Sequence, residues 1–178
     1  MKVLVIPGSL REKSFNKSIA NYIKNNFSGE IEFEVFTLNN IPMFNEDLES
    51  HLPDEVSAVI ELIKESEGVI FVTPEYNNSL PAPTRNLLHW LSRSYSNKYV
   101  IGKPLGIVGV SDGGFGTVRA QHELLLIATV IGLKVDPKMR LPISYALEIF
   151  DDEINLVDEK VKLKIEKFIN DYQSWIKS

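Results

Sequence analysis

Short apolar runs alternate with longer amphipathic stretches along this chain of 178 residues. Four of the runs predict strands, at residues 3–6, 32–38, 69–72 and 105–110, and a fifth strand is expected near 134–141. The stretches between them repeat their apolar positions with helical spacing and predict helices at 15–27, 54–66, 82–95, 117–131 and 157–176. Strand and helix therefore alternate along the chain.

That alternation favours a parallel sheet with helices on both faces, because parallel neighbours are joined by helical crossovers. Of the first four strands, only 32–38 lacks the continuous apolar character of a strand buried on both faces. The predicted fold class is α/β, a flavodoxin-like doubly wound sheet of five parallel strands in the order 2-1-3-4-5. We find no internal repeat or linker in residues 1–178, and 44% apolar content suffices for one sizeable core, so a single domain is expected.

Charge and cysteine content exclude several classes of function. A net charge of −5 without a basic cluster gives no support for nucleic-acid binding. The lack of cysteine excludes disulfides, thiolate metal sites and cysteine nucleophiles, and the three histidines lack metal-ligand spacing, so no metal is expected. The first apolar run is too short for a signal peptide or a membrane span, which predicts a cytoplasmic protein without a membrane partner.

The loop after the first strand has the chemistry of a phosphate site. It offers the hydroxyls of Ser9 and Ser14, the amide of Asn16 and the charge of Arg11, directly before a predicted helix whose N-terminus attracts anions. It matches neither the dinucleotide fingerprint G-x-G-x-x-G nor the P-loop. A single terminal phosphate is therefore favoured over a pyrophosphate or ATP.

Two further loops should meet this one at the carboxyl edge of the sheet, where ligands of doubly wound folds bind. Residues 73–81 follow the third strand and contain Tyr76 and Asn77, and residues 111–117 follow the fourth strand and contain three glycines. An aromatic ring and backbone N–H groups beside a glycine loop suit a flat heteroaromatic ring with a polar rim.

The three loops read G-S-L-R-x-x-S-x-N, T-P-E-Y-N-x-S-x-P and S-x-G-G-x-G-x-x-R-A-Q. This set resembles the NADPH-dependent FMN reductase family, which includes quinone, chromate and azo-dye reductases, and residues 41–48 are similar to the second loop of that family. The chain departs from many members at Gly116-Thr117, where they have a glycine pair, and at His89, where they have an acid.

The resemblance implies a bound FMN, with NADPH or NADH as the hydride donor. Its implied cofactor-binding residues are Ser9, Arg11, Ser14 and Asn16 at the phosphate, Pro74, Glu75, Tyr76 and Asn77 at the ring and ribityl chain, and Ser111, Gly113 and Gly114 beside the ring. No side chain is expected to be catalytic, because the flavin carries the chemistry. The electron acceptor would be a small molecule: a quinone, an azo compound, chromate, a ferric complex or free flavin.

Several alternatives remain open from the sequence. Ser14 can serve as a helix N-cap, Glu75 can shape its loop, and the glycines can simply meet turn geometry. At the level of function, the rivals are a flavodoxin-type electron carrier without NAD(P)H oxidation of its own and a binding protein that holds flavin poorly. Steady NAD(P)H oxidation by the purified protein separates the enzyme from the carrier.

Two predicted helices have more apolar surface than one face of a sheet covers. In 117–131 the apolar side chains surround most of the helix, and in 82–95 Trp90 lies away from the main stripe, so we expect contacts between subunits. The resemblance also implies a homodimer or homotetramer. The last helix has a plain one-sided stripe and should pack on the sheet alone.

Overall fold

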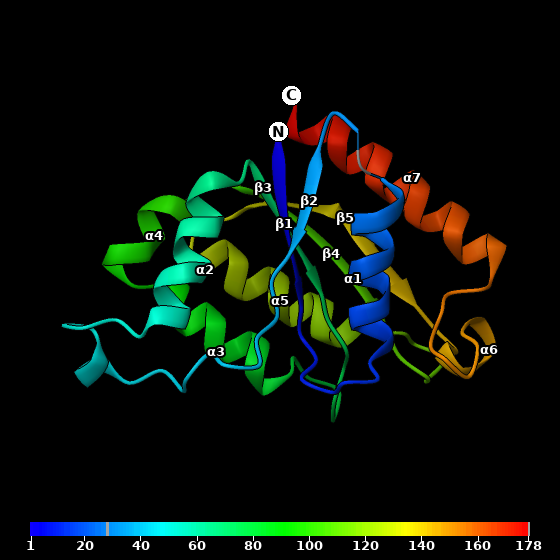
Figure 1. The fold of residues 1–178 in the computed structure, drawn as a ribbon, viewed down its shortest axis with the longest axis horizontal. Helices are drawn as coiled ribbons and strands as arrows, with labels where there is room; N and C mark the ends of the chain where they lie inside the picture. Colours follow the sequence, from blue (N-terminus) through cyan, green and yellow to red (C-terminus); the bar gives the residue numbers. More distant parts are fainter. Residues whose placement is uncertain (28, 178) are drawn as a thin grey trace.

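The computed structural model describes residues 1–27 and 29–177, which contain one parallel sheet of five strands in the order β2-β1-β3-β4-β5 (Figure 1). The strands are β1 (Lys2–Pro7), β2 (Glu32–Val35), β3 (Gly68–Val72), β4 (Pro104–Val110) and β5 (Lys134–Ile143). The helices are α1 (Phe15–Asn26), α2 (Asp54–Glu65), α3 (Ala82–Leu91), α4 (Ser94–Val100), α5 (Val118–Val130), α6 (Ala146–Ile149) and α7 (Glu159–Ile176), with a 3₁₀ turn at Glu46–Leu48. The predicted fold class and strand order are confirmed.

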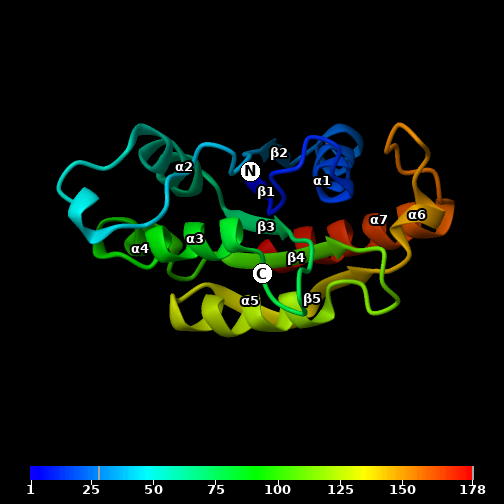
Figure 2. The same cartoon turned by 90° about the horizontal axis from the view of Figure 1, so that it is seen from below.

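Helices cover both faces of the sheet, because successive side chains of each strand point to opposite faces. Val3 and Val5 of β1 pack in the cluster that includes α1 and α7, whereas Leu4 and Ile6 pack in the cluster that includes α2, α3 and α5. Figures 1 and 2 both show α2 to α5 on one side of the sheet and α1 and α7 on the other.

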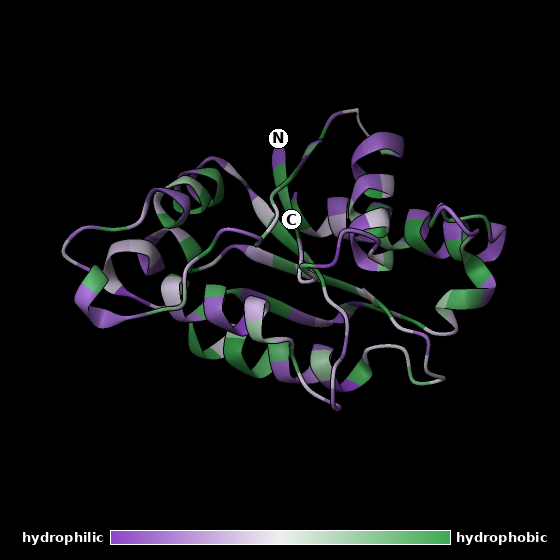
Figure 3. Cartoon of the chain, turned by 60° about the horizontal axis from the view of Figure 1, so that its bottom comes forward, coloured by the Kyte–Doolittle hydropathy of each residue, from purple (hydrophilic) through white to green (hydrophobic). Residues whose placement is uncertain are grey.

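The carboxyl ends of three adjacent strands lie level with one another. Pro7 pairs with Val72, Val72 pairs with Val108, and the ladder continues past β1 as the Gly8 amide donates to the Val72 carbonyl at 2.9 Å. The loops after β1, β3 and β4 therefore leave the sheet at one edge, at the bottom of Figure 1 and far from both termini. Figure 3 brings this edge forward and shows apolar strands behind mostly polar or neutral loops.

The predicted helix at 82–95 is two helices, α3 and α4, separated at Ser92 and Arg93. Trp90 is fully buried, because residues 41–44 lie across it: its Nε1 donates to the Pro42 carbonyl at 2.9 Å, and the Phe44 ring meets it edge-on at 4.9 Å. The interpretation of Trp90 as a free apolar face for another subunit was therefore wrong. A distant segment of the same chain covers it.

Helix α5 does keep apolar side chains on its outer side. Leu124 and Ala128 are buried against the sheet, whereas Val118, Leu126 and Val130 are exposed. The stripe predicted for the last helix is buried from Val161 to Tyr172, as expected for a helix that packs on the sheet alone.

Candidate functional site

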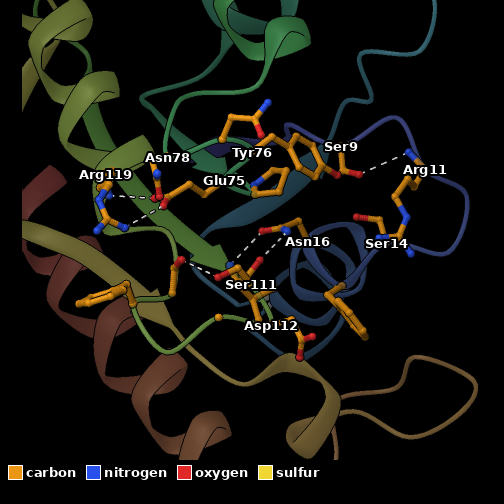
Figure 4. A pocket seen from close by; sticks show the side chains of 17 residues that line it. Ser9, Arg11, Ser14, Asn16, Glu75, Tyr76, Asn78, Ser111, Asp112 and Arg119 are labelled. Atoms are coloured by element: carbon orange, nitrogen blue, oxygen red, sulfur yellow. Dashed lines mark hydrogen bonds and ion pairs between the residues drawn. The ribbon is translucent and has the colours of Figure 1, made fainter.

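The loops after β1, β3 and β4 enclose an open cavity of about 440 Å³ (Figure 4), within the range of small-molecule sites. Its lining residues are Ser9, Arg11, Ser14, Phe15, Asn16, Pro74, Glu75, Tyr76, Asn77, Asn78, Val110, Ser111, Asp112, Gly113, Phe115, Gly116 and Arg119. Every residue that the sequence placed at the site is among them except Gly114. Three segments that are distant in sequence thus converge as predicted.

In the β1–α1 loop, two buried hydroxyls accept hydrogen bonds from the main chain. Ser9 Oγ accepts from the Arg11 amide at 3.3 Å, and Ser14 Oγ accepts from the Lys17 amide at 3.3 Å as the N-cap of α1. Each hydroxyl used as an acceptor still has its own proton to donate. Capping by Ser14 is therefore compatible with donation to a ligand in the cavity.

Arg11 contributes an exposed guanidinium to the phosphate end of the cavity. The residue is exposed and lines the cavity, and no carboxylate of residues 1–27 or 29–177 lies within ion-pair distance of it. The first turn of α1 beside it has backbone N–H groups without intrahelical acceptors and the positive end of the helix dipole. This end of the cavity is suited to an anion.

Asn16 links two of the segments that form the cavity. Its Nδ2 donates to the Val110 carbonyl at 2.9 Å, and its Oδ1 accepts from the Val110 amide at 3.1 Å. The side chain is buried, so both of its polar ends are used to join α1 to the end of β4. It borders the cavity, and its Nδ2 keeps a second proton beyond the one donated to Val110.

The β3–α3 loop is a tight hairpin that presents Tyr76. The amides and carbonyls of Tyr76 and Ser79 bond to each other at 3.3 and 3.0 Å, and the two residues between them have positive φ, 52° at Asn77 and 58° at Asn78. This is a type I′ turn, which asparagine tolerates better than most residues. Tyr76 is half exposed, at 49%, with Pro74 buried behind it.

Glu75 fastens this hairpin to α5. Its Oε2 accepts from the amides of Arg119 and Ala120, both at 2.9 Å, and its Oε1 lies 3.6 Å from the Arg119 guanidinium (Figure 4). The N-cap residue of α5, Thr117, makes no side-chain capping bond, so Glu75 supplies the acceptor that the helix start lacks. The structure thus favours the loop-shaping alternative for Glu75.

Glu123 holds the far end of the same hairpin. Its Oε2 accepts from Ser79 Oγ at 2.8 Å and from the Leu80 amide at 2.7 Å, and its Oε1 pairs with Arg85. Sequence reasoning missed this residue, since a single acid on an amphipathic helix carries no signal of a contact 43 residues away.

In the β4–α5 loop, the glycines have different parts. A Cβ on Gly113 would meet nothing within 4 Å, so the cavity is open there, whereas a Cβ on Gly116 (φ +60°) would lie 3.0 Å from the Ile143 amide nitrogen. Gly114 faces away from the cavity lining: its carbonyl accepts from Ser144 Oγ at 2.9 Å, and Tyr145 lies beside it. The Ser111 hydroxyl donates to the Gly116 carbonyl and closes the loop.

Several lining residues were not assigned from the sequence. They are Phe15, Asn78, Val110, Asp112, Phe115, Gly116 and Arg119. Arg119 was part of the third motif and Asn78 adjoins an assigned residue, so position alone could have marked both. Nothing in the sequence marked Phe15 as a lining residue. Its ring packs on the ring of Phe150, with centroids 4.8 Å apart, and this contact is distant in sequence.

Across residues 1–27 and 29–177, no group of three or more potential metal-ligating side chains is assembled. In the same part of the chain, no helix is both long and apolar enough to cross a membrane. The groups of the cavity that can bind a ligand are its hydroxyls, its arginines and its backbone N–H donors.

Fold and site together define a flavodoxin-like protein of the flavin-binding class. The model of the NADPH-dependent FMN reductase family matches residues 1–148, and the chain belongs to this family. It is 34% identical to an NAD(P)H-dependent FMN reductase of Pseudomonas aeruginosa, with 99% of this chain and 96% of that protein covered. It is 29% identical to a 2-hydroxy-1,4-benzoquinone reductase of Burkholderia, with 99% and 97% covered.

Solved structures agree with this assignment. The flavoenzyme NAD(P)H:(acceptor) oxidoreductase of Paracoccus denitrificans is 29% identical, with a TM-score of 0.86 over 99% of this chain and 97% of that one. An archaeal flavodoxin shares 15% identity with a TM-score of 0.63, a likeness of fold alone. The protein is thus an oxidoreductase of a family that uses FMN and NAD(P)H.

The residues present fit FMN. The phosphate end has a cation without a carboxylate partner, two hydroxyl protons and a helix N-terminus, and the ring end has an exposed aromatic, an unobstructed glycine and the backbone of a tight hairpin. One end of the cavity therefore has groups that bind an anion, and the other end has groups that suit a flat ring with polar edges. FMN joins a phosphate to such a ring.

Proposed function

We propose that this protein is an FMN-dependent NAD(P)H:quinone oxidoreductase. The overall reaction is balanced as NAD(P)H + H⁺ + quinone giving NAD(P)⁺ + hydroquinone, a transfer of two electrons. The observation that carries the proposal is the convergence, on one cavity, of an unneutralised arginine beside a helix N-terminus and an open ring-binding face. The likeness to named quinone and FMN reductases along nearly the whole chain supports it.

Ser9, Ser14 and Arg11 would hold the phosphate, together with the backbone N–H groups of the first turn of α1. The two hydroxyls would each donate one hydrogen bond, and the guanidinium would offset part of the charge of the phosphate dianion. Asn16 would contribute by fixing the start of α1 against β4. This binding mode places the anion where the protein offers positive potential.

The hairpin and the glycine loop would hold the ring. Tyr76 would contact its edge or face, while Pro74, Glu75 and Asn77 set the course of the backbone and Gly113 leaves room for close approach. When bound, FMN would supply the two-electron redox chemistry between the nicotinamide and the acceptor. The protein's residues bind, orient and shield, and none acts as nucleophile.

A quinone is the acceptor class that the relatives favour, since the Burkholderia protein and a further relative from Pseudomonas putida are named quinone reductases. Azo compounds, chromate, ferric complexes and free flavin are the other small acceptors to compare. Purified protein loaded with FMN should oxidise NADPH or NADH steadily with a quinone, and kcat/KM across an acceptor panel would rank the classes. A flavodoxin-type carrier would bind FMN yet show no such turnover, and a protein that holds flavin poorly would stay colourless after FMN addition.

We further propose that the protein is a homodimer or homotetramer that uses the outer side of α5. The exposed Val118, Leu126 and Val130 support this, because such a stripe is normally covered. Light scattering coupled to gel filtration should give a multiple of 20.2 kDa, and Leu126→Glu should lower it. A monomer at micromolar concentration would refute the assignment.

A further inference from the structure

Phe115 and Arg119 form a pair at the mouth of the cavity. Both line it, Phe115 is 69% exposed, and the Arg119 guanidinium carbon lies 4.8 Å from the centre of the Phe115 ring. The distance falls within the range of a cation–π contact. A large aromatic side chain is thus held next to a cation and open to solvent on its other side.

The loop backbone fixes the pair rather than leaving it loose. Gly116 follows Phe115 with φ +60°, a conformation that glycine adopts without strain, and its amide donates to the Gly113 carbonyl at 3.1 Å. A Cβ at this position would lie 3.0 Å from the Ile143 amide nitrogen, so the loop passes close to β5 there. Arg119 stands in the first turn of α5, whose amides are bound by Glu75. Hydrogen bonds therefore hold the backbone that carries both side chains before any substrate arrives.

Arg119 retains capacity to bind an anion. Within residues 1–27 and 29–177, its one ion pair is with Glu75 Oε1 at 3.6 Å, which is longer than a hydrogen bond. Glu75 Oε2 already accepts from two backbone amides. The arginine side chain is 47% exposed. A guanidinium has five N–H donors, so most of them are available to a ligand lying on the neighbouring ring.

We propose that Phe115 and Arg119 form the acceptor subsite and select planar aromatic or quinonoid acceptors that carry an anionic ring substituent. This rests on the proposed function, because the subsite is needed only if electrons leave the flavin for a bound small molecule. The acceptor ring would stack on Phe115, and its anionic substituent would bond to Arg119. Compact acceptors would gain little from either contact.

Binding of redox-inert probes to the FMN-loaded protein tests the subsite without turnover. The probes are 2-naphthoate (planar, anionic), 2-naphthamide (planar, neutral) and cyclohexanecarboxylate (anionic, not planar), measured by calorimetry. Phe115→Leu should weaken 2-naphthoate roughly 2- to 12-fold, the range of an aromatic pair, and Phe115→Tyr should restore it. Leu163→Ala is the matched control, because Leu163 is similarly exposed, at 63%, but lies on α7 outside the cavity.

Arg119→Gln should weaken 2-naphthoate about 2- to 5-fold, as expected for a half-exposed charge pair, and leave 2-naphthamide unchanged. In turnover, the ratio of kcat/KM for naphthoquinone-2-sulfonate to that for 1,4-benzoquinone, a compact neutral acceptor, should fall in both variants. Equal probe affinities in Phe115→Leu and the wild type would overturn the subsite. So would an equal loss of all three probes in Arg119→Gln.

The two proposals fail in different ways. If the protein takes up FMN and oxidises NAD(P)H with quinones, but neither substitution changes the affinity for the probes, the subsite alone is wrong. If it neither binds FMN nor oxidises NAD(P)H, the proposed function fails and the subsite with it. Phe115→Leu decides the outcome even if Arg119→Gln does not fold, since Phe115 bears no buried contact that folding requires.

Discussion

The side-chain amide of Asn16 and the main chain of Val110 form a reciprocal pair of hydrogen bonds, at 2.9 and 3.1 Å, across 94 positions of sequence. Asn16 lies in the first turn of α1, and Val110 is the last residue of β4. The pair thus joins the phosphate-type loop to the glycine loop through buried polar atoms. It explains why two segments with separate chemistry keep one relative position.

Replacing Asn16 should therefore cost stability as well as ligand affinity. Asn16→Ala leaves the buried amide and carbonyl of Val110 without partners, and we expect a loss of about 2–4 kcal/mol in the free energy of unfolding. Urea titration of the flavin-free protein measures it. Asn21→Ala, an exposed asparagine of the same helix, is the control and should change little. A loss of FMN affinity at unchanged stability would mean that Asn16 contacts the ligand directly.

Arg11→Ala should weaken FMN by about 1.5–3 kcal/mol, the value of hydrogen bonds to charged groups, and leave the fold intact. Riboflavin lacks the phosphate, so its affinity should be the same in the variant and the wild type. Quenching of flavin fluorescence gives both constants. Lys13→Ala removes an equally exposed cation of the same loop that does not line the cavity, and it should affect neither ligand. Equal losses for FMN and riboflavin would contradict a phosphate contact.

Glu75→Gln should loosen the start of α5 without altering proton chemistry. The amide oxygen keeps weaker bonds to Arg119 and Ala120 but loses the negative charge at a helix N-terminus, a change of about 1 kcal/mol in stability. Thermal unfolding measures this loss. The pH profile of kcat/KM should keep its shape, and a shifted limb would show that Glu75 moves a proton.

Gly116→Ala should destabilise the protein by about 1 kcal/mol or more, because φ is +60° and the new Cβ would lie 3.0 Å from the Ile143 backbone. Gly29→Ala is the matched control, as a Cβ there meets nothing within 4 Å. Chemical denaturation compares the two variants. If both lose the same amount, the β4–α5 loop does not depend on its glycine.

Tyr172 makes stability depend on alkaline pH. Burial raises the pKa of its hydroxyl far above the ordinary value of 10.0, while the hydroxyl donates to the Pro104 carbonyl at 2.9 Å. Above pH 10 the unfolded chain releases this proton and the folded chain keeps it, so the free energy of unfolding falls as pH rises, by up to about 1.4 kcal/mol per pH unit. Tyr172→Phe should be about 1 kcal/mol less stable at pH 7 and show a shallower decline above pH 10. Urea titrations from pH 7 to 11 compare the slopes, and parallel declines would rule out this origin.

The sequence predicted the sheet order and the convergence of three loops, because periodicity and the carboxyl-edge rule depend only on local pattern. It did not predict that Pro42 and Phe44 would cover Trp90 or that Glu123 would hold the hairpin. Nor did it predict that the Asn16 side chain would form hydrogen bonds with the main chain of Val110. Each of these depends on a partner more than 40 positions away, which no local pattern encodes. The helix break at Ser92 and Arg93 was missed because no glycine or proline marks it.

The cover over Trp90 gives the protein a natural optical reporter. The chain has two tryptophans, and Trp175 is only half-buried, whereas Trp90 has no solvent contact. Lifting residues 41–44 would expose the indole and break its bond to Pro42. A red shift in its emission would therefore time the movement of this segment during catalysis or assembly, with no dye attached.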